Sequence, residues 1–422
     1  MSVLPMGLLP DNATIGRGDG LMIAGCDVLS LASEFGTPLF VYDEDHLRER
    51  CRQAIAAFGD SAVYASKAFL CLAMARLVHE EGMRIDVATE GEAYVALCAG
   101  VPADRLVVHG NNKSHRELEM ALDNRVGRLV VDGFDELDRV ERLVADGHSV
   151  PQVFLRVTPG VDAHTHHYVA TGQDDSKFGF TVATGDAARA VERAVASPAF
   201  DVRGLHVHIG SQVFDVGSFA DALRVVADFA APFRLPELSI GGGLGVAYVE
   251  GESAPTIAEW GDTLRSVAGS LGLESELWAE PGRAIAASAA VTLYTVGGIK
   301  IIPGTRTYVA VDGGMSDNPR PVLYGSGYET FLPRSVAADR PMPIRLVGKH
   351  CESGDVLVRD GWVPNDLSVG DVLATPVTGA YGHSMGSNYN KMLRPAVVFA
   401  RSGDARLVIR RESPEDLIRN DL

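Results

Sequence analysis

The chain has 422 residues, of which 46% are hydrophobic and 22% charged, so it is long enough for two domains with a large core. Its formal net charge of −17 disfavours nucleic acid and anionic membrane surfaces as partners, and we attribute that charge to solubility. The sequence has neither a signal-peptide pattern nor an apolar run of about 18 residues, so we expect no membrane span. The five cysteines are scattered and odd in number, which indicates no disulfide framework and no zinc pattern and fits a reducing cytoplasm.

The N-terminal part is mixed in pattern. Residues 1–36 contain several glycines and are expected to hold one or two short strands. From Pro38 the pattern becomes regular, with a strand over residues 38–42. Asp43 is then a suitable N-cap for a helix that ends near Phe58.

A regular alternation of strands and amphipathic helices follows. The predicted strands are residues 62–69, 84–89, 106–110, 128–132, 153–159, 202–210, 238–243 and 276–283. The clearest helices between them are residues 70–81, 92–99, 134–146, 186–196, 219–233 and 257–271. Alternating strands and helices predict a parallel sheet, and about eight units match a TIM-type (β/α)8 barrel. On periodicity alone, a doubly wound open sheet remains the alternative.

The positions of the polar residues favour the barrel. Nearly every predicted strand ends in a residue that can do chemistry: Lys67, Asp86, His109, Asp132, Arg156, His208, the glycines 241–243, and Glu280 with Arg283. Barrel enzymes carry their sites at the C-terminal ends of the strands and frequently bind phosphate in the loops after the last two.

After about residue 285 the alternation stops. The predicted strands here are residues 289–302, 307–311, 343–347, 356–359, 372–377, 396–400 and 406–411, which indicates a separate β domain completed by the N-terminal segment. We therefore expect an N-terminal segment at 1–36, a barrel at 37–288 and a β domain at 289–422. Two polar, glycine-rich stretches, residues 311–328 and 378–390, are expected to be functional loops.

Lys67 lies near the end of a predicted buried strand, residues 63–69, which is an unusual place for a charge. Its amine either reaches water along the core or has a lowered pKa and forms a Schiff base with a carbonyl compound. The consecutive glycines 241–243 and Arg283 together suit a phosphate. With Glu280 placed to face a pyridine nitrogen, this set suggests pyridoxal 5'-phosphate, although an isolated Glu280 is also an ordinary strand-end carboxylate.

The histidines allow two interpretations. His208 is placed to stack on a cofactor ring with Ser211 on the phosphate, or it is a satisfied core histidine. His206 and His208 are two positions apart on a predicted strand, so both rings lie on the same face and could bind a metal. His164, His166 and His167 raise the same question. Because we find no carboxylate or thiol placed to complete either set, we expect no metal.

Nine stretches, taken together and in this order, carry a family resemblance over nearly the whole chain. They are residues 64–68, 109–114, 172–179, 206–212, 241–243, 280–283, 312–320, 351–355 and 379–390. In these stretches the sequence resembles fold-type III pyridoxal-phosphate decarboxylases, and within that group the diaminopimelate decarboxylases. One departure is Thr89-Glu90-Gly91-Glu92, where the family usually has Ser-Gly-Gly-Glu. A second is Phe69, where many relatives have asparagine.

The resemblance implies Lys67 as the Schiff-base lysine and His208 as the residue stacked on the cofactor. The implied cofactor site comprises Lys67, Asp86, His208, Ser211, Gly241, Gly242, Gly243, Glu280, Gly282, Arg283 and Tyr381. The implied substrate contacts are Arg283, Arg320, Tyr324, Glu352 and Tyr381, with Cys351 as the proton donor. Tyr389 is the weaker candidate for the role of Tyr381.

The implied reaction converts meso-2,6-diaminopimelate to L-lysine and CO2, the last step of lysine biosynthesis. Such a site must recognise an amino acid at the far end of the substrate. Arg320 or Arg283 suits the distal carboxylate, and Glu352 suits the distal ammonium. Cys351 could protonate the α-carbon. The alternative, which would be preferred without the resemblance, is that Cys351 is an inert structural thiol.

Several alternatives stay open on sequence alone. One is a decarboxylase of ornithine, lysine or arginine, although these substrates lack the distal carboxylate that Arg320 would bind. Another is a racemase, which needs two opposed proton donors. A third is a cofactor-binding homologue without turnover. The resemblance also implies a homodimer with shared active sites, in which Cys351 and Glu352 reach the barrel of the partner subunit.

Overall fold

The computed structural model describes residues 3–161 and 176–422. Two compact units emerge: the barrel unit is Arg50–Gly245 with Ala254–Ala284, and the β unit is Met1–Glu49, Val246–Ser253 and Ile285–Leu422. The three histidines at 164, 166 and 167 lie outside the described residues, as does the start of the 172–179 motif.

The barrel unit contains eight parallel strands that neighbour one another in chain order. They are β5 (Val63–Ala65), β6 (Arg84–Val87), β7 (Leu106–Val108), β8 (Arg128–Val131), β9 (Gln152–Thr158), β11 (Asp201–His206), β12 (Glu237–Ser239) and β13 (Glu276–Trp278), with β10 (Phe180–Thr181) beside β9. The first and last strands also meet, because Val63 N donates to Ala279 O at 2.9 Å and Ala65 N to Pro281 O at 3.2 Å. The predicted (β/α)8 barrel is therefore confirmed, and the open-sheet alternative is wrong.

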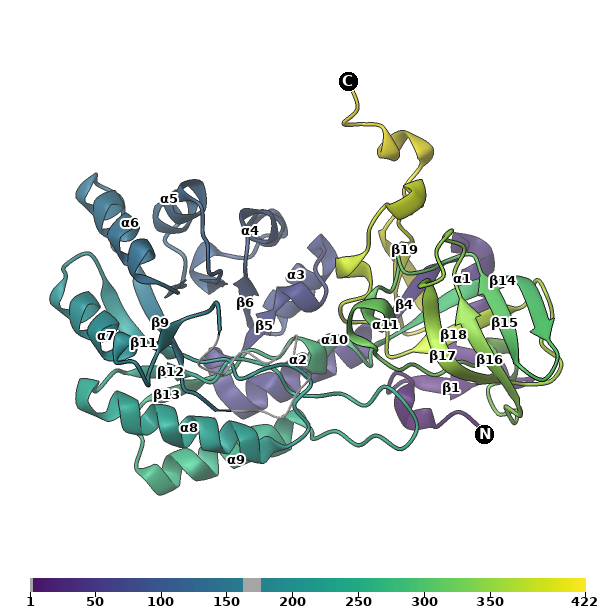
Figure 1. The fold of residues 1–422 in the computed structure, drawn as a ribbon, viewed down its shortest axis with the longest axis horizontal. Coiled ribbons are helices and arrows are strands. Elements are labelled where there is room, and N and C mark those ends of the chain that lie inside the picture. The colour runs from purple at the N-terminus through teal and green to yellow at the C-terminus, as the bar shows by residue number, and fades with distance from the viewer. Residues whose placement is uncertain (1–2, 162–175) are drawn as a thin grey trace. The chain divides into compact units, whose positions relative to one another are not determined.

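Helices lie outside these strands, as Figure 1 shows for α3 to α9. Their bounds are α2 (Glu44–Phe58), α3 (Leu72–Glu80), α4 (Glu90–Cys98), α5 (His115–Asp123), α6 (Phe134–Ala145), α7 (Asp186–Ala196), α8 (Val216–Ala230), α9 (Ile257–Leu271) and α10 (Arg283–Ala286). The predicted cap is confirmed, because Asp43 Oδ1 accepts a hydrogen bond from His46 N at 3.0 Å. We did not predict α5, a nine-residue helix that begins with a capping box between Ser114 and Glu117.

The barrel interior is filled by apolar side chains. Val63, Val107, Val130, Phe154 and Trp278, from five different strands, form one buried cluster. The helices cover the outside through one face each; in α7, for example, the buried residues recur at helical spacing at Ala187, Ala190, Val191 and Ala194. A packed interior leaves the two ends of the barrel as the places for a ligand site.

The β unit is built on an eight-stranded sheet. Its order is β17-β16-β15-β14-β4-β19-β20, with β18 also paired to β14. The strands are β4 (Leu39–Asp43), β14 (Ala290–Ile302), β15 (Arg306–Val311), β16 (Met342–Val347), β17 (Val356–Val363), β18 (Val372–Pro376), β19 (Ala396–Arg401) and β20 (Asp404–Ile409). All seven C-terminal strands expected from the sequence are present.

One strand lies elsewhere than expected. We placed residues 38–42 at the start of the barrel, but β4 pairs with β14 and β19 in the β unit. Every residue of β4 is buried, and a central strand of either sheet has that pattern, so burial alone does not distinguish the two. The segment Val246–Ser253, which follows the glycine loop, also belongs to the β unit.

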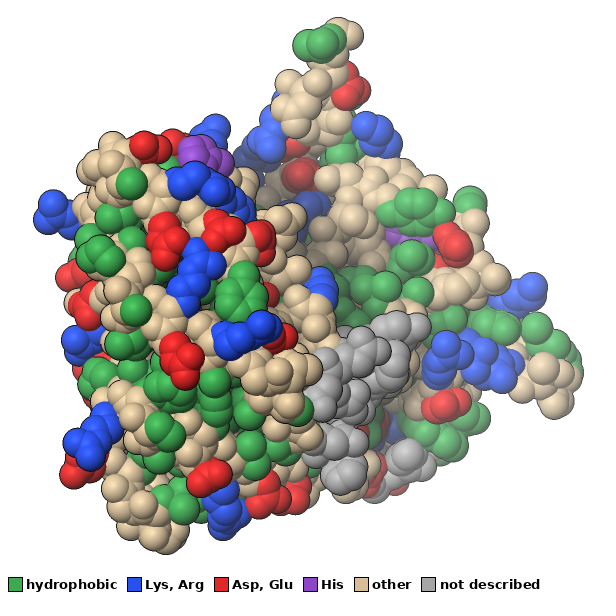
Figure 2. Space-filling view, turned by 60° about the vertical axis from the view of Figure 1, so that its left-hand side comes forward, with side chains coloured by type: hydrophobic (Ala, Val, Ile, Leu, Met, Phe, Trp, Pro, Cys, Tyr) green, Lys and Arg blue, Asp and Glu red, His purple; other side chains and the backbone are tan. Residues whose placement is uncertain are grey.

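The N-terminal residues contribute a small sheet of their own within the β unit. It consists of β1 (Ala13–Ile15), β2 (Leu21–Ile23) and β3 (Cys26–Asp27), and α1 (Val28–Phe35) follows. Over residues 3–161 and 176–422, none of the helices has the length and apolar character needed to cross a membrane. On the face drawn in Figure 2, positive and negative side chains are interspersed rather than gathered by sign.

Candidate functional site

Lys67 lies just beyond the end of a barrel strand. β5 ends at Ala65, and residues Ser66–Ala68 form a single 3-10 turn, so the expectation of a strand through Phe69 is wrong. The Lys67 Nζ atom lies 3.0 Å from Asp86 Oδ2, in an ion pair whose side chains are 49% and 2% exposed. The amine therefore stands at the end of the barrel, half-exposed and held by a buried carboxylate, instead of in the core.

Residues 89–92, where the sequence departs from the usual family pattern, form a capped start of helix α4. Thr89 is the N-cap of α4, and its hydroxyl accepts a hydrogen bond from Glu92 N at 3.2 Å. Glu92 Oε2 in turn accepts a hydrogen bond from Ala88 N at 2.6 Å. Burial is the main cause that raises the pKa of Glu92. Threonine thus caps this helix through its hydroxyl, as serine would.

The glycine loop after β12 has no room for side chains. A Cβ atom on Gly241 would lie 2.3 Å from Val207 O, one on Gly242 2.2 Å from Glu280 O, and one on Gly243 2.1 Å from Gly210 O. Gly241 and Gly243 also have φ angles of +69° and +118°. The surface of this loop is therefore formed by backbone atoms, as a phosphate-binding loop requires.

Arg283 and Ser211 lie together in the same unit. Arg283 Nη2 donates to Ser211 Oγ at 2.9 Å. The neighbouring Gly282 is held against the first strand, since a Cβ atom there would lie 2.9 Å from Ala65 O. A guanidinium beside a hydroxyl is a pair that suits an oxyanion.

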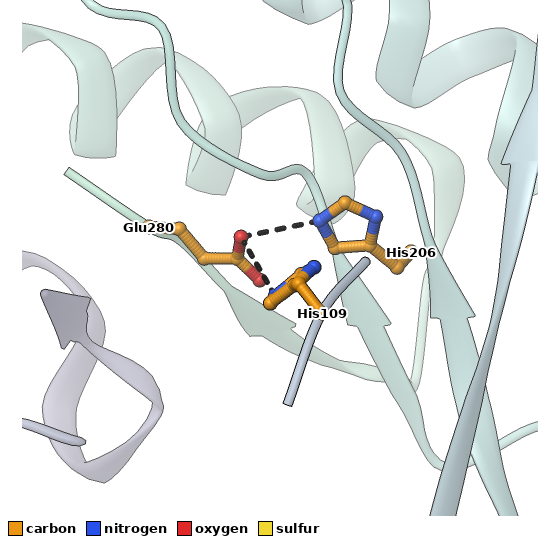
Figure 3. A group of neighbouring side chains, drawn as sticks. All are labelled: His109, His206 and Glu280. Carbon is orange, nitrogen blue, oxygen red and sulfur yellow. Dashed lines mark hydrogen bonds and ion pairs between the residues drawn. The ribbon is translucent and has the colours of Figure 1, made fainter. Parts of the chain in front are cut away.

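Glu280 lies among donors from three other strand ends, and Figure 3 shows it with His109 and His206. Glu280 Oε2 lies 3.2 Å from His206 Nε2 and 3.4 Å from His109 Nε2. Glu280 Oε1 accepts a hydrogen bond from Ser239 Oγ at 3.0 Å. Burial alone would raise the pKa of Glu280, but His206 and His109 outweigh it and hold that pKa well below its ordinary value. Glu280 is therefore an anion.

The imidazole of His208 is neutral. Its Nδ1 atom accepts a hydrogen bond from Gly242 N at 3.3 Å, which ties the side chain to the glycine loop. Burial is the largest cause that holds the pKa of His208 well below its ordinary value, and the charges of Lys67 and Arg156 act in the same direction. A neutral, flat ring suits stacking on an aromatic cofactor.

The sequence interpretation of the histidines needs one correction. We expected no carboxylate near His206, but Glu280 lies beside it, and the ligand-capable atoms of His109, His206 and Glu280 lie within 4.8 Å of one another. The reason given against a metal is therefore wrong for His206. The pairing was hidden because the three residues come from different strands and meet only when the barrel closes.

Arg320 is the first residue of α11 (Arg320–Tyr324) in the β unit and is 4% exposed. Its guanidinium lies 4.2 Å from the ring centroid of Tyr248 and 5.5 Å from that of Tyr328, and Nη1 donates to the Tyr328 hydroxyl. Its Nε atom is buried with no hydrogen-bond partner among the described residues. No described carboxylate pairs with this cation, whose neighbours are aromatic rings and a hydroxyl.

Three loops of the β unit meet around His350. Its Nε2 atom lies 2.9 Å from Ser316 Oγ, and its Nδ1 atom lies 2.9 Å from Asn390 Oδ1. Both glycine-rich stretches predicted as functional thus meet the segment that carries Cys351 and Glu352. These last two side chains are exposed, and Tyr389 donates its hydroxyl to Glu352 Oε2 at 2.7 Å.

The predicted site residues fall into two groups. The barrel unit holds Lys67, Asp86, His208, Ser211, Gly241, Gly242, Gly243, Glu280, Gly282 and Arg283, and the β unit holds Arg320, Tyr324, Cys351, Glu352 and Tyr381. Tyr324 and Tyr381 are partly exposed, and Tyr381 has a φ of +57°. Sequence reasoning named His109 only as a strand-end residue and His206 only as a possible metal ligand, and it assigned no role to Ser239, Tyr248 or Tyr328. For Ser239, the available signal was its place at a strand end two residues before the glycine loop.

Comparison with known proteins gives consistent results. Residues 44–287 match the family described as "Pyridoxal-dependent decarboxylase, pyridoxal binding domain". A diaminopimelate decarboxylase of Mycobacterium tuberculosis is 46% identical over 97% of this chain and 96% of its own length. One of Bacillus subtilis is 44% identical over 95% of each chain. The crystal structure of the M. jannaschii diaminopimelate decarboxylase with L-lysine matches with a TM-score of 0.90 at 32% identity, covering 98% of both chains.

Proposed function

The chain belongs to the diaminopimelate decarboxylase family of pyridoxal-dependent decarboxylases, and from that premise we propose how its residues carry out the reaction. The reaction is the decarboxylation of meso-2,6-diaminopimelate to L-lysine and CO2, a step of lysine biosynthesis, with pyridoxal 5'-phosphate as cofactor. The assignments of individual residues below are our proposal.

The barrel unit fits this cofactor. The glycine loop 241–243, which has no space for a Cβ atom, would hold the phosphate together with Ser211 and Arg283. Lys67 would provide the amine that binds the aldehyde, and Asp86 would hold that amine in place. Glu280 would face the ring nitrogen, and His208 would stack on the ring. When bound, the cofactor withdraws electrons from the α-carbon of the amino acid as CO2 leaves.

Arg320 is the observation that carries the choice of substrate. A buried guanidinium without a carboxylate leaves its desolvation uncompensated, so its natural partner is an anion from outside the chain. The distal carboxylate of meso-diaminopimelate supplies that anion. Lysine, ornithine and arginine have no carboxylate there, which is why we do not propose them as substrates.

Cys351 and Glu352 would act at the two remaining positions. Glu352, held by the Tyr389 hydroxyl, would bind the distal ammonium. Cys351 would deliver the proton to the α-carbon after CO2 has left. Tyr324 and Tyr381 would complete the substrate and cofactor contacts. Exposure of Cys351 and Glu352 in the β unit supports these roles, since a group that meets a substrate must be accessible.

We further propose a cytoplasmic homodimer with shared active sites. Apart from Tyr381, the proposed cofactor residues belong to the barrel unit, whereas Cys351 and Glu352 belong to the β unit, so a two-fold pair could combine them from different chains. The five cysteines are all thiols in the structure, which supports a reducing compartment.

The role of Arg320 is tested by substitution. Arg320→Ala should raise the KM for meso-diaminopimelate by at least about thirtyfold, which corresponds to about 2 kcal/mol of lost substrate binding. The dissociation constant of the cofactor should not change, because Arg320 is not among its proposed contacts. Arg359→Ala, which removes an exposed arginine of the same unit, is the matched control and should leave both constants unchanged. An unchanged KM in Arg320→Ala would exclude Arg320 as the residue that binds the distal carboxylate.

A further inference from the structure

The donors around Glu280 form an arrangement that the proposed reaction has not yet explained. His109 follows β7, His206 ends β11 and Ser239 ends β12, and all three direct a polar atom at the carboxylate of Glu280. The two imidazole rings also contact each other, edge to face, with centroids 4.8 Å apart and planes at 70°. In Figure 3 both Nε2 atoms approach the same carboxylate oxygen. We call His109 and His206 the histidine pair.

His206 approaches the carboxylate as a neutral donor. Burial is the main cause that lowers the pKa of His206, so its ring is uncharged at neutral pH. His206 Nδ1 is buried without a hydrogen-bond partner among the described residues, and Nε2 faces a carboxylate oxygen. This places the single ring proton of His206 on Nε2. A neutral N–H donor favours the ionised form of a carboxylate without cancelling its charge.

No lysine or arginine among the described residues forms an ion pair with Glu280. Its side chain contacts the histidine pair and Ser239, and its backbone N donates to Gly241 O at 2.8 Å. Buried ion pairs of the usual kind occur elsewhere in the barrel unit, as between Lys113 and Glu136 at 2.8 Å. A cation at that distance would satisfy Glu280 and leave little attraction for a ligand. Because no such cation pairs with Glu280, its negative charge stays available to a positively charged group that enters the site.

The other charged and titratable groups at this end of the barrel act on the same cluster. They are Lys67 after β5, Asp86 on β6, Arg156 on β9 and His208 after β11; of these, Arg156 and His208 interact electrostatically with Glu280. They remain unchanged in the variants proposed below. Any difference in pH dependence between the variants and the parent protein therefore reports on the histidine pair.

We propose that His109 and His206 are positioning residues: they fix the Glu280 side chain and keep it ionised, so that its carboxylate pairs with the protonated ring nitrogen of the cofactor. This inference rests on the proposed function, which places Glu280 at that nitrogen. Because the two rings also support each other, loss of either should disturb Glu280, and the effects of the two losses should not add.

The test compares leucine and glutamine variants at both positions. His206→Leu and His109→Leu remove the donor, whereas His206→Gln and His109→Gln retain an N–H. Apo-protein is titrated with pyridoxal phosphate between pH 6 and pH 8, and the dissociation constant is measured by fluorescence. At pH 6 the leucine variants should bind about ten- to a hundredfold more weakly than the parent protein, because they have lost a polar contact with a charged group. The glutamine variants should recover much of that loss.

The sign of the pH effect distinguishes positioning from simple damage. Without the histidine pair, Glu280 binds a proton at a higher pH than in the parent protein. Relative to the parent protein, cofactor affinity of the leucine variants should therefore fall as the pH decreases from 8 to 6. A merely structural loss would weaken binding equally at all pH values. The 15N chemical shift of cofactor labelled at the ring nitrogen gives a second readout, which should move toward the unprotonated value in the leucine variants.

Two controls complete the test. His148→Leu removes another histidine–carboxylate contact of the barrel unit, His148 Nδ1 to Asp123 Oδ1 at 2.6 Å, and should change neither readout. Glu280→Gln should weaken cofactor binding at every pH; if it does not, the proposed place of Glu280 is wrong. If Glu280→Gln weakens binding but the leucine variants match the parent protein in affinity and 15N shift, the proposed role of the histidine pair is overturned. It is also overturned if Zn²⁺ displaces the cofactor and the leucine substitutions abolish that competition, since the three side chains would then be a metal site.

Discussion

At the scale of single residues, buried charges are of two kinds: those paired with an oppositely charged side chain, which support the fold, and those without such a partner, which we expect to bind a ligand. Lys113 is 1% exposed and pairs with Glu136, and Arg128 is similarly paired with Glu237. In such pairs the two charges compensate each other, and the pair supports the fold. Arg320 and Glu280 are buried just as deeply, yet neither pairs with an oppositely charged side chain among the described residues. These two incomplete charges mark the places where the substrate and the cofactor are expected to bind.

Asp317 in the β unit is a third kind of buried charge. Its pKa is raised from 3.8 to about 7, mainly by burial and also by the charges of the nearby Asp312 and Asp355. Between these two values, the folded protein holds a proton that the unfolded chain has released. The free energy of unfolding should therefore fall as the pH rises from about 4 to about 7, and then level off.

Replacing Asp317 with asparagine should remove this dependence. The loss of stability attributable to Asp317 amounts to at most about 4 kcal/mol across its pH range. Asp317→Asn should consequently lose less thermal stability than the parent protein when the pH is raised from 5 to 8. Asp360→Asn, at an exposed position, is the control and should follow the parent protein. If thermal denaturation shows parallel pH profiles for Asp317→Asn and the parent protein, Asp317 does not titrate as described.

At the scale of elements, the loops after the barrel strands hold the proposed cofactor site. The eight strands and their glycine loop followed from the sequence, because strand–helix alternation and consecutive glycines are local signals. The contacts of Glu280 did not follow, because His109 and His206 precede it by 171 and 74 positions and meet it only in the closed barrel. Likewise β4 was assigned to the wrong sheet, since burial on both faces is common to central strands of both units.

The glycine loop gives a direct prediction. In Gly242→Ala the new methyl group would lie 2.2 Å from Glu280 O, so the loop must move. We expect cofactor affinity to fall at least about tenfold and the melting temperature to decrease, as for other steric insertions into a packed site. Gly269→Ala in α9 is the matched control, because its methyl group meets nothing within 4 Å and alanine favours the helix. Equal cofactor affinity in the two variants would contradict the role of this loop.

At the scale of the whole molecule, the proposed residues are divided between two units. Lys67 belongs to the barrel unit and Cys351 to the β unit. In the homodimer we propose, the active site combines Lys67 of one chain with Cys351 of its partner. The alternative is that both residues act within one chain, and complementation between inactive variants distinguishes the two arrangements.

Lys67→Ala and Cys351→Ala should each be inactive alone. When they are mixed under conditions that exchange subunits, each mixed dimer regains one intact site, so about a quarter of full activity should return with random pairing. Light scattering before mixing establishes the dimer, and mass spectrometry of differently labelled subunits establishes the exchange. Activity that stays at the level of the separate variants, despite exchange, would show that the two residues act from the same chain.

The central claim is that this chain decarboxylates an amino acid with a second amino-acid end. The most direct measurement is CO2 release from meso-diaminopimelate, lysine, ornithine and arginine, with pyridoxal phosphate present and Lys67→Ala as the inactive control. We predict release from meso-diaminopimelate alone, with one L-lysine formed for each CO2. Release from lysine, ornithine or arginine at a comparable rate, or no release from meso-diaminopimelate, would contradict the account.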